Sequence, residues 1–240
     1  MDTRSLARSA LAAASTASWR ARYLVRRRRV LASIPPQADF HLGCGDHRIE
    51  ARVNIDVRPT SATDLVADLN RPRLPPARSV VSHAFFEHLY RNDRVPHLQA
   101  VREALTPDGW VLYLGLPDFR EVARLYLEGA PGLVSERFDL YHVYRYTHGD
   151  PEHVVGWWRE QLHKSLFDHD EVDALLRAAG FGSWMIANYA FVSEPHALNL
   201  GFYARNDENA SMALATEAVG EFADQVNVGS LRWSAPRRHP

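Results

Sequence analysis

HLGCGDHRIEARVNID, residues 41–56, is the stretch that decides the fold class. Residues 39–42 predict a strand that ends at the Gly-Cys-Gly turn at 43–45, and residues 52–57 predict a second strand with Asp56 at its end. A glycine-rich turn at the carboxyl end of a strand lets a ligand approach the backbone closely. The connection between the two strands is too short for the helix of a full crossover. The stretch therefore predicts a ligand site at the strand ends, without a helix directly after the first strand.

The rest of the chain alternates short apolar runs with helical stretches. Further strands are expected at 63–68, 79–83, 110–116, 183–192 and 197–205, helices at about 92–105 and 168–179, and a turn at 106–109. Strands that alternate with helices are typical of an α/β fold with a parallel sheet. The last two strands are expected to form an antiparallel pair. The prediction is a mostly parallel sheet, flanked by helices, with an antiparallel last strand.

Three parts are expected along the chain. A basic N-terminal helical segment covers 1–34, the main domain covers 35–205 with an aromatic-rich insertion at 119–162, and a C-terminal tail covers 206–240 with one helix and an irregular end. The N-terminal segment holds eight arginines against one acidic residue. Three interpretations of it stay open: a helix that packs on the domain, a helix that contacts anionic lipid or an anionic substrate, and a cleaved organellar transit peptide.

Composition and charge exclude several classes of protein. The formal net charge is −1, and residues 35–240 alone carry −8, so the main domain offers no basic face for nucleic acid. A single cysteine, Cys44, excludes an internal disulfide framework and fits a reducing compartment. No apolar run approaches the ~20 residues of a membrane span. We expect a cytoplasmic protein, and the sequence leaves its oligomeric state open.

The glycine turn and the acidic residue after it distinguish between nucleotide ligands. An acidic residue that ends the second strand can accept hydrogen bonds from both hydroxyls of a ribose, and Asp56 is in that position. A dinucleotide-binding loop has a third glycine, where this chain has Arg48, and its acidic residue follows about 20 residues on. Asp56 follows Gly45 much sooner. A nucleoside ligand without a pyrophosphate therefore fits better than NAD or NADP.

Five motifs in order give the chain a resemblance to a known family. They are His-Leu-Gly-Cys-Gly (41–45), Asn-Ile-Asp (54–56), Ala-Asp-Leu (67–69), Ser-His-Ala-Phe-Phe-Glu-His-Leu (82–89) and Leu-Thr-Pro-Asp-Gly-Trp (105–110). The chain resembles the class I S-adenosylmethionine-dependent methyltransferases, whose sheet is Rossmann-like. More narrowly, it looks like a bacterial group with a shortened first crossover and a Glu-His-Leu motif. The family's Pro-Gly-Gly turn reads Pro-Asp-Gly in this chain.

The resemblance implies S-adenosyl-L-methionine as cofactor and gives each candidate residue a role. Gly43, Cys44 and Gly45 are expected to lie beneath the methionine part of the cofactor. Asp56, followed by Val57, is expected to bind the ribose hydroxyls. The remaining cofactor candidates are Asp68 and the backbone of Leu69, which face the adenine, and His83, which borders the sulfonium.

The acceptor is expected to be a small molecule or glycan: a hydroxyl on a sugar, a glycolipid or a secondary metabolite. Methyl transfer to an alcohol needs a base for the hydroxyl proton, and His163 and His88 are the candidate catalytic residues because both lie in motifs. Glu87 is interpreted as structural. Histidine spacing matches no compact metal-ligand motif, so no metal is expected. Substrate identity is expected to lie in the insertion at 119–162.

Two other classes of function remain open. A nicotinamide-dependent oxidoreductase shares the general fold. The absence of a third glycine and the short spacing between Gly45 and Asp56 in this chain count against it. A non-catalytic interaction module could keep the fold without the chemistry, although it would have no local reason to keep Asp56 and Asp68.

Overall fold

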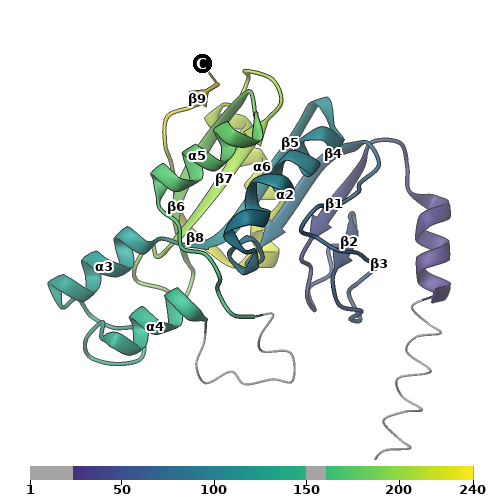
Figure 1. Cartoon of the computed structure of the whole chain (residues 1–240). Coiled ribbons are helices and arrows are strands. Elements are labelled where there is room, and N and C mark those ends of the chain that lie inside the picture. Colours follow the sequence, from purple (N-terminus) through teal and green to yellow (C-terminus); the bar gives the residue numbers. More distant parts are fainter. Residues whose placement is uncertain (1–23, 150–160, 240) are drawn as a thin grey trace, which may run out of the picture.

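The computed structural model describes residues 24–149 and 161–239. Within these ranges the strands form one sheet in the order β3-β2-β1-β4-β5-β7-β6-β8, and β9 also pairs with β6 (Figure 1). The strands are β1 (Ala38–Leu42), β2 (Val53–Asp56), β3 (Leu65–Val66), β4 (Ala77–His83), β5 (Leu105–Pro117), β6 (Ser183–Phe191), β7 (Asn199–Arg205), β8 (Val228–Trp233) and β9 (Arg237–Arg238).

Strand direction confirms the predicted fold class. Strands β3, β2, β1, β4 and β5 are parallel neighbours, whereas β7 runs antiparallel to both β5 and β6. Leu42 at the end of β1 is in register with Ile55 of β2 and with Ser82 of β4. Because parallel strands end at the same edge of a sheet, the residues that follow these three positions meet at one edge.

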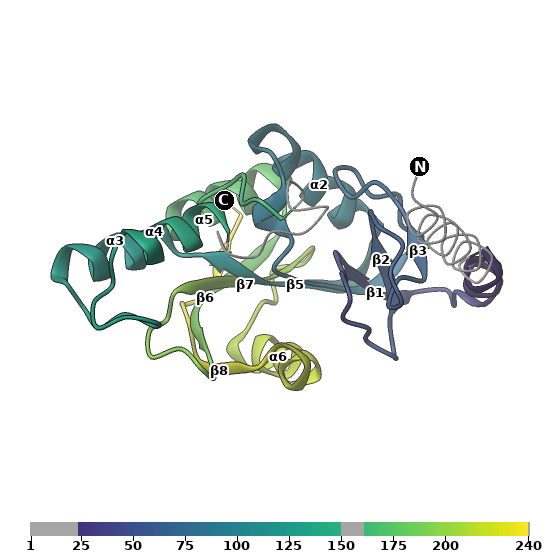
Figure 2. The same cartoon turned by 90° about the horizontal axis from the view of Figure 1, so that it is seen from below.

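Helices cover the two faces of the sheet unequally. Helices α2 (Arg91–Ala104) and α5 (His169–Ala179) pack on one face, where Leu98 and Leu176 join the larger apolar cluster. Helix α6 (Met212–Val226) packs on the other face, where Phe222 contacts a second cluster. Figure 2 shows the sheet between these layers, with α6 alone on its side. Residues 43–52 contain no helix, as predicted, and α6 supplies apolar cover on that face.

Local sequence explains where the helices begin and end. Asp168 accepts a hydrogen bond from the Glu171 N–H at the start of α5, and Gly180 ends that helix in the left-handed region. Ser211 accepts from the Leu214 N–H at the start of α6. These caps satisfy backbone groups that a helix cannot pair internally.

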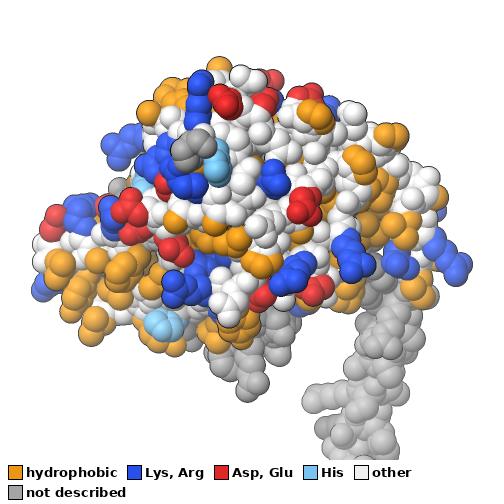
Figure 3. Space-filling model, turned by 45° about the horizontal axis from the view of Figure 1, so that its top comes forward, with side chains coloured by type: hydrophobic (Ala, Val, Ile, Leu, Met, Phe, Trp, Pro, Cys, Tyr) orange, Lys and Arg blue, Asp and Glu red, His pale blue; other side chains and the backbone are white. Residues whose placement is uncertain are grey.

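The described part of the insertion, 119–149, forms α3 (Phe119–Glu128) and α4 (Leu140–His148) and no strand. The two helices share a small apolar cluster that includes Val122, Phe138 and Tyr146. Apolar side chains also gather on the outer surface at this end of the molecule (Figure 3). The most exposed of them are Leu127, Val134 and Leu140.

The N-terminal segment is described only from residue 24 onward, and residues 24–33 are helical. Figures 1 and 2 place this helix at the β3 end of the sheet. Arg26 ties it there, because its guanidinium donates to the backbone oxygens of Ser61 (2.6 Å) and Thr63 (3.0 Å). The expectations for residues 1–23 lie outside the described residues. Among the described residues, no helix is long and apolar enough to cross a membrane.

Two predictions of secondary structure are wrong. The expected turn at 106–109 is part of β5, where an irregularity in the pairing with β4 accommodates Pro107 and Gly109. The C-terminal end is not irregular, because β8 and β9 pair with β6 and extend the sheet. Neither strand has a clear alternating pattern, and both depend on the edge that β6 offers.

Candidate functional site

The turn after β1 needs glycine at its first position. Gly43 has a φ of +67°, and a Cβ there would lie 2.4 Å from Cγ of Phe85. Gly45 has a φ of +52°. The N–H of Gly43 donates to the Ile55 oxygen at 2.9 Å. The backbone therefore lies directly against the Phe85 ring, with no side chain between the turn and the space above it.

Asp56 connects the end of β2 to this turn. One carboxylate oxygen accepts from the Gly45 N–H at 2.8 Å, and the other accepts from the Arg58 N–H at 2.8 Å. The residue is only 6% exposed. The Arg58 guanidinium also lies beside the carboxylate, with Nε 3.9 Å from one oxygen. An ionised carboxylate has about four acceptor positions, so two positions remain for hydrogen bonds from a ligand after the two backbone bonds.

Asp68 and Leu69 follow β3 and form the next part of the site. Asp68 is exposed, and its carboxylate accepts from the Asn70 N–H at 2.9 Å. Leu69 is buried, and its carbonyl oxygen accepts from Nδ1 of His97 at 2.5 Å. The other nitrogen of His97 accepts from the Tyr113 hydroxyl at 2.7 Å. His97 on α2 thus fixes the position of the Leu69 backbone, a role that the sequence did not indicate.

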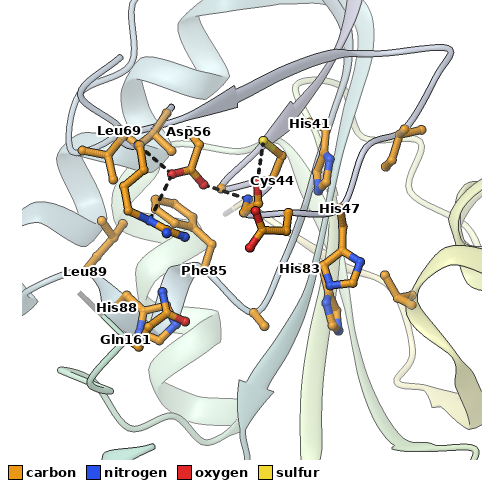
Figure 4. A pocket seen from close by; sticks show the side chains of 18 of the residues that line it. His41, Cys44, His47, Asp56, Leu69, His83, Phe85, His88, Leu89 and Gln161 are labelled. Carbon is orange, nitrogen blue, oxygen red and sulfur yellow. Dashed lines mark hydrogen bonds and ion pairs between the residues drawn. The ribbon is translucent and has the colours of Figure 1, made fainter. Parts of the chain in front are cut away.

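All the predicted cofactor residues line one cavity of about 670 Å³ at the carboxyl edge of the parallel strands (Figure 4). They are Gly43, Cys44, Gly45, Asp56, Val57, Asp68, Leu69 and His83. In Figure 4, Asp56 and Leu69 lie on one side of the Phe85 ring, whereas His41, His47 and His83 lie on the other.

His83 ends β4 between two aromatic rings. Its ring meets Phe191 of β6 and Phe222 of α6 edge-on, at centroid distances of 5.5 and 6.3 Å. Burial lowers the pKa of His83 to about 4, and Nε2 has no hydrogen-bond partner. His83 is consequently a neutral imidazole at neutral pH. A buried nitrogen of this kind can bind a polar ligand group.

Cys44 lines the cavity but is no nucleophile. Burial raises the pKa of its thiol to about 12, and nearby Asp56 and Asp64 raise it further. The thiolate is the reactive form of cysteine, so Cys44 contributes shape and not covalent chemistry.

The two candidate bases differ in their relation to the cavity. His88 lines it, whereas His163 is not part of its wall. Their rings lie next to each other, with centroids 5.3 Å apart. Burial lowers the pKa of both histidines, that of His88 to about 4. Glu87 lies beside them in a short 3-10 helix (Phe86–His88), and burial raises its pKa to about 8.

Several cavity residues were not predicted from the sequence. The wall also includes Phe85, Tyr90, Lys164, Phe191, Phe222, Val226 and Asn227. The Ser-His-Ala-Phe-Phe-Glu-His-Leu motif could have indicated Phe85, because it directly follows the β4 end. The last three come from the C-terminal part, and no local signal connects them to a ligand.

No protein-family model matches the chain, and no curated protein matches it. Solved structures do resemble it. A methyltransferase from Thermotoga maritima, described as S-adenosylmethionine-dependent and as a possible histamine N-methyltransferase, has 13% identity and a TM-score of 0.47 over 79% of this chain and 91% of the other. A TehB-like methyltransferase from Corynebacterium glutamicum has 14% identity and a TM-score of 0.40 over 81% and 98%.

A glycopeptide N-methyltransferase in complex with S-adenosyl-L-methionine has 14% identity and a TM-score of 0.42 over 74% of this chain and 84% of the other.

Proposed function

We propose that this chain is an S-adenosyl-L-methionine-dependent methyltransferase that transfers a methyl group to a hydroxyl of a small molecule or glycan. The observation that carries the proposal is the cavity: the ends of β1, β2, β3 and β4 bring the glycine turn, Asp56, the Asp68-Leu69 pair and His83 to one cavity. A volume of about 670 Å³ lies within the range for small-molecule sites.

The polar groups of this wall suit an adenosine. The two free acceptor positions of Asp56 match the two hydroxyl donors of a ribose. The exposed carboxylate of Asp68 offers an acceptor for an adenine amino group. The bare backbone at 43–45 leaves room for the methionine part, beside Phe85.

A dinucleotide suits the wall less well. Pyrophosphate binding uses the N-terminus of a helix directly after the glycine turn, and residues 43–52 contain no helix. Arg48, which stands in place of the third glycine, is already paired with Asp64 at 2.7 Å. We therefore consider a nicotinamide-dependent oxidoreductase a weaker candidate than a methyltransferase.

Methyl transfer from a sulfonium is an in-line displacement that depends on alignment and on exclusion of water. His88 lines the cavity, and its ring is neutral at neutral pH, so one ring nitrogen carries no hydrogen. That nitrogen can accept the proton of an acceptor hydroxyl. Lys164 lies beside it, where its ammonium donates to the His88 oxygen at 3.1 Å and lies over the Tyr90 ring. We assign the acceptor to this side of the cavity.

Calorimetric titration of the purified chain with S-adenosylhomocysteine, and separately with NAD and NADP, tests the proposal. We expect saturable binding of one S-adenosylhomocysteine per chain and no binding of the nicotinamide nucleotides. Binding of NAD or NADP alone would replace the methyltransferase with an oxidoreductase. No binding of any of the three would favour a non-catalytic interaction module.

A further inference from the structure

Glu87, His88 and His163 form a cluster that the proposed function does not fully use. Each residue offers one ligand atom, and the three atoms lie within 4.8 Å of one another. Glu87 and His88 follow β4, whereas His163 comes from the segment before α5. The backbone N–H of Lys164 donates to the backbone oxygen of Glu87 at 2.8 Å and holds the two segments together.

Hydrogen bonds fix the orientation of both imidazole rings. Nδ1 of His88 lies 3.1 Å from the Leu162 oxygen, and Nδ1 of His163 lies 2.8 Å from the Tyr146 oxygen. A carbonyl oxygen can only accept, so Nδ1 carries the hydrogen in each ring. In a neutral imidazole this leaves a lone pair on Nε2. Histidines that bind metals have this arrangement, in which the outer nitrogen donates to a carbonyl or carboxylate.

Glu87 adds a buried carboxylate whose charge is not compensated. It is 2% exposed, and its Oε2 has no hydrogen-bond partner. Its Oε1 lies 3.7 Å from Nε2 of His88. A buried carboxylate oxygen without a partner is costly, and two imidazole lone pairs beside it give it no donor. The cluster therefore needs a positive charge, either a proton or a metal ion.

Gly149 lies beside His163. This glycine ends α4 with a φ of +96°, and a Cβ there would lie 4.0 Å from Nε2 of His163. His88 lines the cavity. An ion bound to its Nε2 would thus be at the cavity wall, with one side toward a ligand.

We propose that Glu87, His88 and His163 bind one divalent transition-metal ion through one carboxylate oxygen and two Nε2 atoms. Two imidazoles and a carboxylate suit Zn²⁺ and its neighbours in the first transition series, whereas Mg²⁺ and Ca²⁺ prefer oxygen ligands. The sequence did not indicate this site, since His163 is distant in the chain from the Glu-His pair.

The bound ion could act as a Lewis acid on an acceptor hydroxyl and lower the pKa of that hydroxyl. This role rests on the proposed function, but metal binding does not. His88 would then be a metal ligand, and the hydroxyl proton would go to solvent or to another base in the cavity.

The test uses the full chain, freed of metal by a chelator and titrated with Zn²⁺ against a chromophoric competitor. We expect one Zn²⁺ per chain. Substitution of the metal by Co²⁺ should give a visible absorption spectrum with bands that report nitrogen and oxygen ligands. Both measurements need neither cofactor nor acceptor, so they remain informative if the chain does not bind S-adenosylhomocysteine.

Variants identify the ligands. Glu87→Gln and His163→Gln should each weaken Zn²⁺ binding by more than the 10–100-fold that loss of an outer partner typically causes. The control is His196→Gln, whose ring bonds to the Pro131 oxygen outside the cluster, and its affinity should match that of the parent. Glu87→Gln keeps the shape of the side chain, and circular dichroism checks its fold.

Two results would overturn the proposal: a parent chain that binds no stoichiometric Zn²⁺, or a folded Glu87→Gln variant that binds Zn²⁺ as the parent does. The cluster would then hold a proton between Glu87 and His88. Because the parent measurement stands alone, failure of a variant to fold does not leave the proposal undecided.

Discussion

The Asp56 carboxylate accepts a hydrogen bond from the Gly45 N–H at 2.8 Å, so the residue that ends β2 also holds the glycine turn that follows β1. Its second oxygen holds the Arg58 N–H at 2.8 Å. Asp56, the residue proposed to bind the ribose, is therefore also part of the structure of the turn. A change at Asp56 should affect both ligand binding and the conformation of the loop.

Asp56→Ala is expected to abolish binding of S-adenosylhomocysteine. It also leaves two backbone N–H groups without an acceptor, at about 1–3 kcal/mol for each buried group that stays unpaired. Calorimetry and urea unfolding measure the two effects. Asp68→Ala is the matched control for stability alone, because Asp68 is exposed and its loss should change stability by less than about 0.5 kcal/mol. Parent-like binding by Asp56→Ala would mean that the cofactor site is elsewhere.

Gly43→Ala should destabilise the chain and impair ligand binding. The added Cβ would meet the Phe85 ring at 2.4 Å in a backbone conformation that disfavours alanine, and overpacking typically costs about 1–3 kcal/mol. Gly220→Ala on α6 provides the opposite control, since no atom lies within 4 Å of a Cβ there. That change should stabilise the chain by about 0.5–1 kcal/mol. Thermal unfolding compares the two variants.

Cys44 should react slowly with thiol reagents. A thiol pKa of about 12, against an ordinary value of 9.0, lowers the thiolate fraction at pH 8 roughly a thousandfold. Alkylation by iodoacetamide in the folded chain should therefore be far slower than in the chain unfolded in urea. Equal rates in the two states would show that the glycine turn opens to solvent readily.

Acid should weaken the fold through His97. Burial lowers the pKa of His97 to about 4, below the ordinary 6.5, so protons bind the unfolded chain more readily. The stability contribution of the neutral ring is complete above pH 6.5 and is lost as the pH falls from 6.5 toward 4, by up to about 3 kcal/mol. Urea unfolding at pH 7, 6, 5 and 4.5 measures the slope.

The variant His97→Gln should flatten that slope, because glutamine does not titrate. His41 and His83, whose pKa values burial also lowers to about 4, should keep part of it. Burial raises the pKa of Glu87 to about 8, so Glu87 contributes a slope of opposite sign between about pH 4.5 and 8, and the effect of His97 is read as the difference between variant and parent at each pH. An unchanged slope in His97→Gln would assign the acid sensitivity to other groups.

Deletion of residues 1–33 should leave affinity for S-adenosylhomocysteine within about twofold of the parent, because the described part of this segment contributes no residue to the cavity. The helix at 24–33 exposes Leu24, Val25 and Leu31 beside its arginines, and a basic helix with apolar side chains favours anionic membranes. Flotation with phosphatidylserine vesicles should therefore recover the parent chain but not the deletion variant. Weaker cofactor binding by the variant would assign the segment to the site.

The sequence predicted the part of the site that depends on local order. Asp56 and His83 could be placed because each ends a strand, and strand ends meet at one edge in any parallel sheet. The close contact between the Gly43 backbone and the Phe85 ring could not be predicted, since it depends on how closely two loops approach each other. The meeting of Glu87 with His163 was missed for the same reason: no periodic pattern reports a contact between distant segments.

The cover of the second face was also missed. One helix was expected in the C-terminal tail, 206–240, but its sequence does not say which surface it covers. Because the short first crossover leaves that face without a helix, the sheet could accept α6 there. Phe222 and Val226 then became part of the cavity wall.

The position of α6 makes the turn at 43–45 depend on a helix far along the sequence. The turn at 43–45 is made early in the chain, yet the wall opposite it comes from residues beyond 220. A chain that stopped before α6 would leave Val81, Leu112 and Met185 facing water. The half of the sheet that carries the glycine turn is thus not a separable module, and the cavity is complete only in a chain that has been synthesised through α6.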